Sequence, residues 1–257
     1  MDDIRNFQIF AQLILISFGY WSGYLSKSPL DFFTIIFSSL IFQYLLIDRK
    51  KLGFNWKSPV ITSLSLILLL KSVTVFLWPL MSFLCIGSKR LTIKGKHFLN
   101  PSLFGILIGV TILKNYIWMT PGAWGEAALL LLTFLLIGSY LLFNVSSKST
   151  ILSFLGTYFS LLILRQIYLG DPLALYTHQV SNISFILFSF FMISDPKTVP
   201  RYAFAQCLFG GITALFCYYF KFFHFEPYFL YYGLACSAFF LPILRNYQFN
   251  ARRYHYV

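Results

Sequence analysis

The stretch from Ser184 to Pro200, with the sequence SFILFSFFMISDPKTVP, joins an apolar aromatic helix directly to a charged turn. Asp195 can accept bonds from free backbone N–H groups, and Pro196 cannot donate to a helical ladder. Pro200 suits the first position of a new helix. In lipid, backbone groups freed at such a break are tolerated only against protein or a water-filled cavity. The stretch therefore predicts either an ordinary turn between two transmembrane helices or a broken helix beside a site.

Composition places the chain among polytopic membrane proteins. Of its 257 residues, 58% are hydrophobic and only 11% are charged, which is outside the range of soluble domains. The acidic start Met1-Asp2-Asp3 and the long first apolar run do not fit a cleavable signal peptide. The four cysteines lie in apolar segments without the paired spacing of zinc or iron–sulfur ligands, so we expect no metal site.

The apolar residues form ten segments. They fall near residues 8–24, 30–47, 59–70, 74–87, 101–114, 124–143, 150–168, 178–194, 201–220 and 226–244. The region 59–87 would be about 43 Å long as one helix, too long for a hydrocarbon core of about 30 Å. Because Lys71 and Ser72 interrupt it, we expect two helices there.

Basic residues support this division. With ten spans and a cytoplasmic N-terminus, 15 of the 20 Lys and Arg residues face the cytoplasm. With a single span over 59–87, more of the basic residues would lie outside than inside. Both termini are therefore expected in the cytoplasm. Topology also explains the net charge of +12, so no nucleic acid is expected as a partner.

Ten spans can be two sets of five, and a repeat with an odd number of spans inserts upside down the second time. The third and eighth segments share a weak pattern, Thr62-Ser-Leu-Ser-Leu-Ile-Leu and Ser181-Asn-Ile-Ser-Phe-Ile-Leu. Both end at an interruption, which is typical of a central binding site in inverted repeats. We therefore predict an all-α membrane protein of one domain, 1–257, with repeats of about 1–115 and 116–246, broken third and eighth helices, and a basic tail at 247–257.

Polar residues on the two interrupted segments have two interpretations. Hydroxyl and amide groups there serve helix packing or line a cavity. The cavity candidates are Ser65, Lys71, Asn182 and Ser184. At the cytoplasmic side, the basic loop from Lys89 leads to a helix start at Asn100-Pro101, which suits a phosphate or an anionic lipid head group.

Glu126 lies about one turn inside the sixth segment. Acids at membrane depth indicate proton or cation handling, although Lys114 is near enough in sequence to pair with this one. The four histidines do not place two ligands at mid-membrane depth, so a bis-histidine haem is not expected. No catalytic triad, P-loop or dinucleotide-binding glycine pattern occurs, and no catalytic residue is predicted.

Three stretches resemble, in this order, the signatures of one membrane family. They are Lys96–Gly105 (KHFLNPSLFG), Pro121–Gly125 (PGAWG) and Phe191–Pro200 (FMISDPKTVP). The family comprises the D subunit of the Rnf electron-transport complex, the B subunit of the sodium-pumping NADH:quinone reductase and their short bacterial relatives. The resemblance implies an inverted five-plus-five helix fold in the bacterial cytoplasmic membrane, and flavin-linked electron transport coupled to ion movement alongside partner subunits.

The resemblance also bears on whether a flavin is attached covalently. Full-length members carry FMN esterified to a threonine, in a motif ending Gly-Ala-Thr or Gln-Ala-Thr, in a long loop between the fifth and sixth helices. Here that loop shrinks to about 114–123, the motif is missing, and Thr120 precedes Pro-Gly instead. We therefore expect no covalent FMN.

Two main hypotheses remain open. In the first, the chain is at most a subunit of a membrane oxidoreductase and uses a noncovalent flavin (FMN or riboflavin) or a quinone. The cavity candidates would then be joined at the cytoplasmic side by Asp195, Lys197, Thr198, His97 and Asn100. In the second, the chain is a transporter or channel for a small solute or ion with the same fold. A purely structural membrane subunit would need no site.

Overall fold

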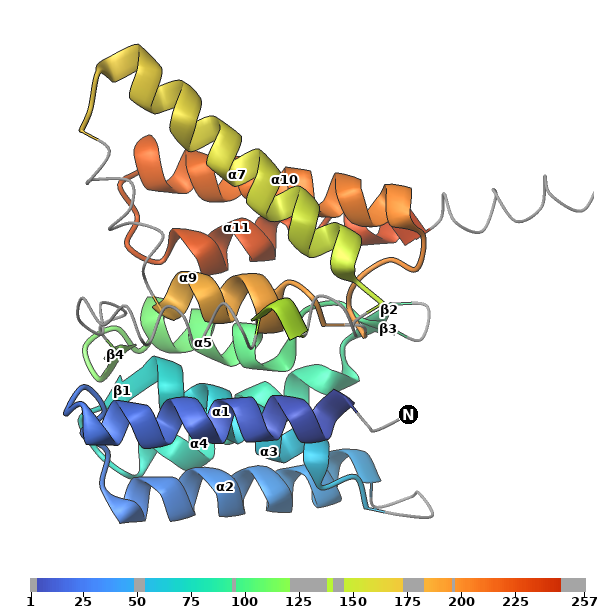
Figure 1. Cartoon of the computed structure of the whole chain (residues 1–257). Coiled ribbons are helices and arrows are strands. Elements are labelled where there is room, and N and C mark those ends of the chain that lie inside the picture. Colours follow the sequence, from blue (N-terminus) through green and yellow to red (C-terminus); the bar gives the residue numbers. More distant parts are fainter. Residues whose placement is uncertain are drawn as a thin grey trace, which may run out of the picture. The chain divides into compact units, whose positions relative to one another are not determined.

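The computed structural model describes residues 4–48, 54–93, 96–120, 138–140, 146–172, 183–195 and 197–245 (Figure 1). The chain divides into two compact units, Met1–Gly125 (unit 1) and Glu126–Val257 (unit 2). As predicted, the described residues are mostly helical. Within the described ranges, three helices are long and apolar enough to cross a membrane, at Pro29–Asp48, Lys148–Leu169 and Ala203–Phe222.

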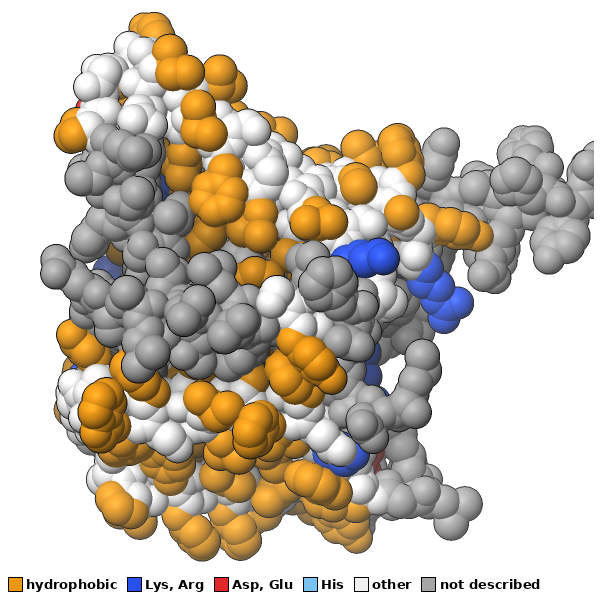
Figure 2. Space-filling model, viewed as in Figure 1, with side chains coloured by type: hydrophobic (Ala, Val, Ile, Leu, Met, Phe, Trp, Pro, Cys, Tyr) orange, Lys and Arg blue, Asp and Glu red, His pale blue; other side chains and the backbone are white. Residues whose placement is uncertain are grey.

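Large apolar side chains cover much of the exterior, as Figure 2 shows. On the helix α7 (Lys148–Leu169), Leu164, Ile167 and Tyr168 are 63%, 75% and 87% exposed. Such apolar surface is costly in water but favourable against lipid. The exterior therefore fits a protein of the bilayer.

Unit 1 contains five α-helices among its described residues: α1 (Ile4–Trp21), α2 (Pro29–Gln43), α3 (Lys57–Leu69), α4 (Leu77–Gly87) and α5 (Pro101–Thr111). The helix α2 continues as one π-helical stretch, η1 (Tyr44–Asp48). Its start is fixed by a capping box, in which Ser28 and Asp31 each accept the other's backbone N–H group. The helix α3 packs on α1 and α2, and α4 packs on α2 and α5.

The predicted interruption near Lys71 is confirmed, since α3 ends at Leu69 and α4 begins at Leu77. Between them, the strand β1 (Leu70–Ser72) pairs antiparallel with β4 (Ile117–Met119), with Lys71 opposite Trp118. On either side of this ladder, Val73 N–H donates to Tyr116 O at 3.0 Å and Thr120 N–H donates to Leu69 O at 2.9 Å. Protein backbone thus receives part of the groups that the break frees.

A short hairpin precedes α5. After a 3₁₀ turn, η2 (Ser88–Arg90), the strand β2 (Thr92–Ile93) pairs antiparallel with β3 (Lys96–His97). Asn100 then begins α5, and its Oδ1 accepts from the N–H groups of Ser102 (3.0 Å) and Leu103 (3.4 Å). The predicted N-cap is confirmed.

Unit 2 is built around α10 (Ala203–Phe222), which packs on both α7 and α11 (Phe229–Ala238). The short helix α9 (Ile183–Leu187) continues as a π-helical stretch, η3 (Phe188–Met192), and ends just before Asp195. Gly210 allows α10 to approach α7, because a Cβ at this position would overlap the carbonyl oxygen of Thr150. Aromatic rings fill the core between these helices. Phe154, Tyr158, Phe188, Phe209 and Tyr231 are all at most 2% exposed.

Candidate functional site

Asp195 organises the turn that was predicted after the eighth segment. Its Oδ1 accepts from the Lys197 N–H at 3.0 Å, and its carbonyl oxygen accepts from the N–H groups of Thr198 and Val199 at 2.9 and 3.0 Å. The Thr198 hydroxyl also donates to the Asp195 carbonyl, at 3.0 Å. Asp195 and Thr198 thus build a local turn.

Three side chains from other parts of unit 2 hold this turn in place. Ser147 Oγ, just before α7, donates to Ser194 O at 2.6 Å. Gln206 Nε2 on α10 donates to Pro200 O at 3.0 Å. The buried Arg245 guanidinium donates to Thr198 O. Because each bond reaches a backbone carbonyl, the turn is fixed independently of the side chains that it presents.

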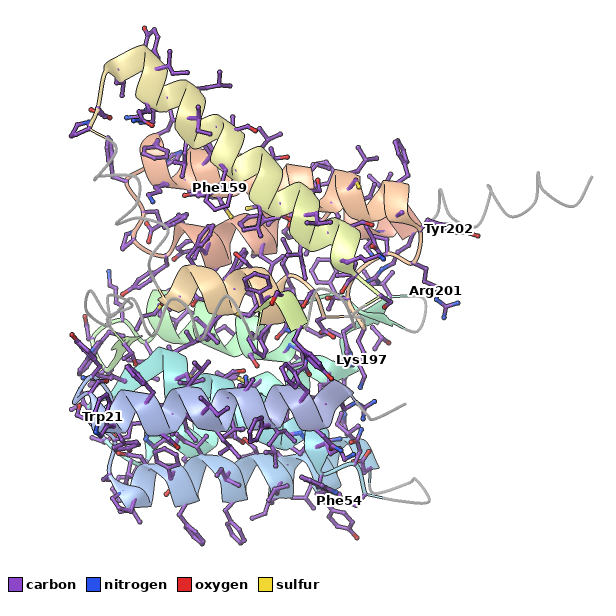
Figure 3. The ribbon with its side chains drawn as sticks, viewed as in Figure 1. Trp21, Phe54, Phe159, Lys197, Arg201 and Tyr202 are labelled. Carbon is purple, nitrogen blue, oxygen red and sulfur yellow. The ribbon has the colours of Figure 1, made fainter. Side chains whose placement is uncertain are left out.

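The turn presents its basic residues to the outside. Lys197 and Arg201 are exposed, and Arg201 extends away from the helices in Figure 3. Thr198 is buried, and Asp195 is only partly exposed. Of the three candidates in this segment, Lys197 is the exposed one.

A buried aromatic cluster surrounds Tyr158 of α7. Its ring lies 5.8 Å from that of Phe154, 5.3 Å from that of Phe185 and 6.4 Å from that of Phe229, between centroids. Tyr158 is 1% exposed, and its hydroxyl has no hydrogen-bond partner among the described residues. An unused donor in an apolar, aromatic setting is costly, so this hydroxyl fits a ligand that offers an acceptor.

The predicted candidate Ser184 belongs to the same part of unit 2. It is half-buried on α9, next to Phe185 of the aromatic cluster and beside the hydroxyl of Tyr231. Asp195 follows eleven residues later, so the structure separates Ser184 from the Asp195 turn by the length of α9 and η3. Sequence reasoning missed Tyr158. The visible signal was a tyrosine inside the apolar segment 150–168, followed by the segment 178–194 with its several serines.

In unit 1, the hydroxyls of α3 are already bonded. Ser65 Oγ accepts from Gln12 Nε2 of α1 at 2.9 Å and donates to Ile61 O. Thr62 and Ser63 donate to the carbonyls of Ser58 and Pro59, one turn earlier in the same helix. These bonds favour the packing interpretation of the α3 hydroxyls over a lined cavity.

The other unit 1 candidates lie at opposite ends of the unit. Lys71 sits on β1, beside the strand that follows α5, whereas His97 and Asn100 precede α5. The eleven residues of α5 separate these places by about 16 Å. Asn182 and Glu126 lie outside the described residues.

A buried polar network joins the ends of α2, α3 and α4. Lys89 Nζ donates to Gln43 Oε1 at 2.8 Å and to Ser58 Oγ at 3.0 Å. Gln43 Nε2 donates to the carboxylate of Asp48 at 2.8 Å, and Asp48 also accepts from Asn55 N–H at 3.2 Å. Lys89, Gln43 and Asp48 are all nearly inaccessible to solvent.

Two of the four basic residues of the predicted loop are already bonded within the protein. Lys89 points into the protein, and the exposed Arg90 donates to Leu46 O at 2.8 Å, so neither side chain is held ready for a phosphate. Asp48 was missed, although an acid at the end of an apolar segment was a visible signal. Its π-helical setting in η1 is unusual, and such stretches are often found at functional sites.

Comparison with protein-family models finds no match, and comparison with curated proteins finds no significant relative.

Proposed function

We propose that this chain is an integral membrane subunit of a flavin- or quinone-linked electron-transport system, which holds its cofactor noncovalently. It would have about ten spans in a bacterial cytoplasmic membrane, with both termini in the cytoplasm and with other membrane or redox subunits as partners. The resemblance of Lys96–Gly105 and Phe191–Pro200 to the Rnf D and sodium-pumping reductase B subunits supports this proposal.

The single observation that carries the redox interpretation is the Tyr158 hydroxyl within its aromatic cluster, which no described residue bonds. Flavins and quinones are planar rings edged by carbonyl acceptors. Tyr158 would donate to such a carbonyl, and neighbouring rings would pack on the faces of the ligand. The bound group would supply the electron-accepting chemistry, while these residues would orient it and keep water away.

Thr120 does not fit a covalent flavin. It is 4% exposed, and its N–H is bonded to Leu69 O at the end of the β1–β4 ladder. An esterified flavin there would need the hydroxyl on an open surface. The noncovalent form of the proposal is therefore favoured.

A repeated packing contact supports the proposed inverted repeat. In unit 1, Gly105 of α5 meets Cys85 of α4, and in unit 2, Gly233 of α11 meets Cys217 of α10. In the five-plus-five scheme, α4 corresponds to α10 and α5 corresponds to α11. The same contact thus recurs between equivalent helices.

The first test is to purify the full chain in mild detergent and record its visible absorbance before and after denaturation. We expect about one equivalent of flavin in the supernatant and none on the chain, or uptake of FMN, riboflavin or a quinone when these are added. A preparation that stays colourless after these additions, with no quinone bound, would contradict the redox proposal. Flavin on the chain would contradict its noncovalent form.

The substitution Tyr158→Phe tests the site itself. Loss of one neutral hydrogen bond should weaken cofactor binding about fivefold, equivalent to about 1 kcal/mol. The exposed Tyr202 provides the control Tyr202→Phe, which should leave binding unchanged. Equal binding by both variants would exclude Tyr158 as a ligand-binding residue.

Transport of a small solute or ion is the second candidate, and the interruption between α3 and α4 is the observation that favours it. The β1–β4 pairing uses part of the backbone that the interruption frees, which leaves fewer groups to bind a solute. The transport candidate therefore ranks below the redox proposal. Solute uptake by liposomes that contain a colourless preparation would reverse that order.

A further inference from the structure

Lys27 lies in the segment 22–28, which joins α1 to α2 at the end of α1 marked by Trp21 in Figure 3. Although this segment is a connection, Lys27 is only 7% exposed. Its Nζ lies 3.8 Å from the centroid of the Trp78 ring and has no hydrogen-bond acceptor among the described residues. A lysine ammonium has three N–H donors, and the described part of the chain offers none of them an acceptor.

The neighbours of Lys27 are held by bonds that do not involve its ammonium group. Trp78 Nε1 donates to Asp31 Oδ1 at 2.6 Å. Asp31 Oδ2 accepts from Ser28 N–H and Ser28 Oγ, at 3.0 and 2.9 Å. The Tyr20 hydroxyl donates to the carbonyl oxygen of Lys27 at 2.5 Å. These bonds leave the amine itself without a hydrogen-bond acceptor among the described residues.

Opposing effects decide the charge of this amine. The Trp78 ring and the carboxylate of Asp31 favour the protonated form, whereas burial and the positive charge of Lys71 on β1 disfavour it. Tyr20 of α1, Asp31 of α2 and Lys71 of β1 are the titratable groups that face it. Burial is the largest effect, and it lowers the pKa of Lys27 from 10.5 to about 7.

We infer that Lys27 is a proton-binding site, neutral while packed on Trp78, and that uptake of a proton from solvent releases the segment 22–28 from this packing. The charged amine would then reach water or other acceptors, which its buried position denies it. The proton-binding site requires no cofactor, so it can be tested independently of the electron-transport proposal. If the amine instead stayed protonated in a permanent cation–π contact, its pKa would lie near the ordinary lysine value. The ammonium group would then be a more than 1,000-fold weaker acid.

The experiment titrates the tryptophan fluorescence of the full chain in detergent micelles from about pH 5 to pH 10. A charge that leaves the face of Trp78 should change its emission, so we expect a transition near pH 7. The transition should vanish in Lys27→Met and in Trp78→Phe, which assigns it to this pair among the five tryptophans. It should persist in the control Lys114→Met, because Lys114 is exposed. A transition that survives Lys27→Met, or one that occurs only near pH 10, would overturn the inference.

A second measurement uses the wild-type chain alone, in case Lys27→Met fails to fold. Hydrogen exchange of the segment 22–28, corrected for the intrinsic pH dependence, should lose protection as the pH falls through about 7. Constant protection over this range would equally overturn the inference. Thermal stability should also rise between about pH 7 and pH 10, because the unfolded chain then binds the proton that folded Lys27 has released.

Discussion

Each unit contains a close contact between a glycine and a cysteine of a neighbouring helix, but the two contacts differ in how closely the backbones approach. In unit 1, a Cβ on Gly105 would overlap the sulfur of Cys85, and the nearest backbone atom would be 3.6 Å away. In unit 2, a Cβ on Gly233 would overlap the sulfur of Cys217 and also lie 2.8 Å from the Cys217 backbone nitrogen. A side chain limits the approach in unit 1, whereas the main chain limits it in unit 2.

This difference predicts which glycine tolerates a methyl group once the sulfur is removed. Gly233→Ala should destabilise unit 2 by about 3 kcal/mol, and Gly105→Ala should cost unit 1 about 1–2 kcal/mol, because overpacking forces side chains or backbone to shift. Thermal unfolding in detergent measures both effects.

Double variants sharpen the same comparison. Cys85→Ala should restore most of the stability lost in Gly105→Ala, whereas Cys217→Ala should restore little in Gly233→Ala, since the backbone clash remains. A double-mutant cycle measures each coupling. Equal rescue in both units would show that the backbones approach equally closely.

The irregular segments of the two units differ in a second way. In unit 1, the break after α3 is held by main-chain pairing between β1 and β4. In unit 2, the Asp195 turn is held by the side chains of Ser147, Gln206 and Arg245. Single side-chain substitutions should therefore affect the turn of unit 2 more than the break of unit 1.

Arg245→Met is the strongest test of the unit 2 turn. It removes a buried charged donor to Thr198 O, and hydrogen bonds from charged groups contribute about 1.5–3 kcal/mol. We expect a destabilisation of about 2 kcal/mol in thermal unfolding. The matched control is Arg201→Met, which changes an exposed guanidinium beside the same turn and should cost less than about 0.5 kcal/mol. A similar loss in both variants would indicate a general charge effect.

Local signals in the sequence predicted several helix ends, although Pro200 was wrong as a helix start, since α10 begins at Ala203. Asn100-Pro101, Asp195 and the Lys71-Ser72 interruption act within one turn of the chain, so their effect can be seen without the fold. Contacts across the chain could not be predicted in this way. The strand partners Lys71 and Trp118 are 47 residues apart, and nothing in either segment specifies the other.

The candidate site shows the same limit. Lys27 and Lys89 lie between apolar segments of the sequence, where the expected topology places loop cations. Trp78 and Gln43, which bury them, lie 51 and 46 residues away. Asp31 and Asp48 were visible at the ends of an apolar segment, and the rule for acids at membrane depth would have drawn attention to them.

The smallest expected effect compares one serine from each irregular segment. Ser147 Oγ is buried and donates to Ser194 O at 2.6 Å, so Ser147→Ala leaves that buried carbonyl without this donor and should cost about 1 kcal/mol. Ser72 on β1 donates only to Thr74 O, two residues along an exposed stretch. Since the β1–β4 ladder does not need this hydroxyl, Ser72→Ala should change the stability by less than about 0.5 kcal/mol. Thermal unfolding of both variants under one condition measures the difference, and a larger loss from Ser72→Ala would mean that side chains, rather than main-chain pairing, hold the break in unit 1.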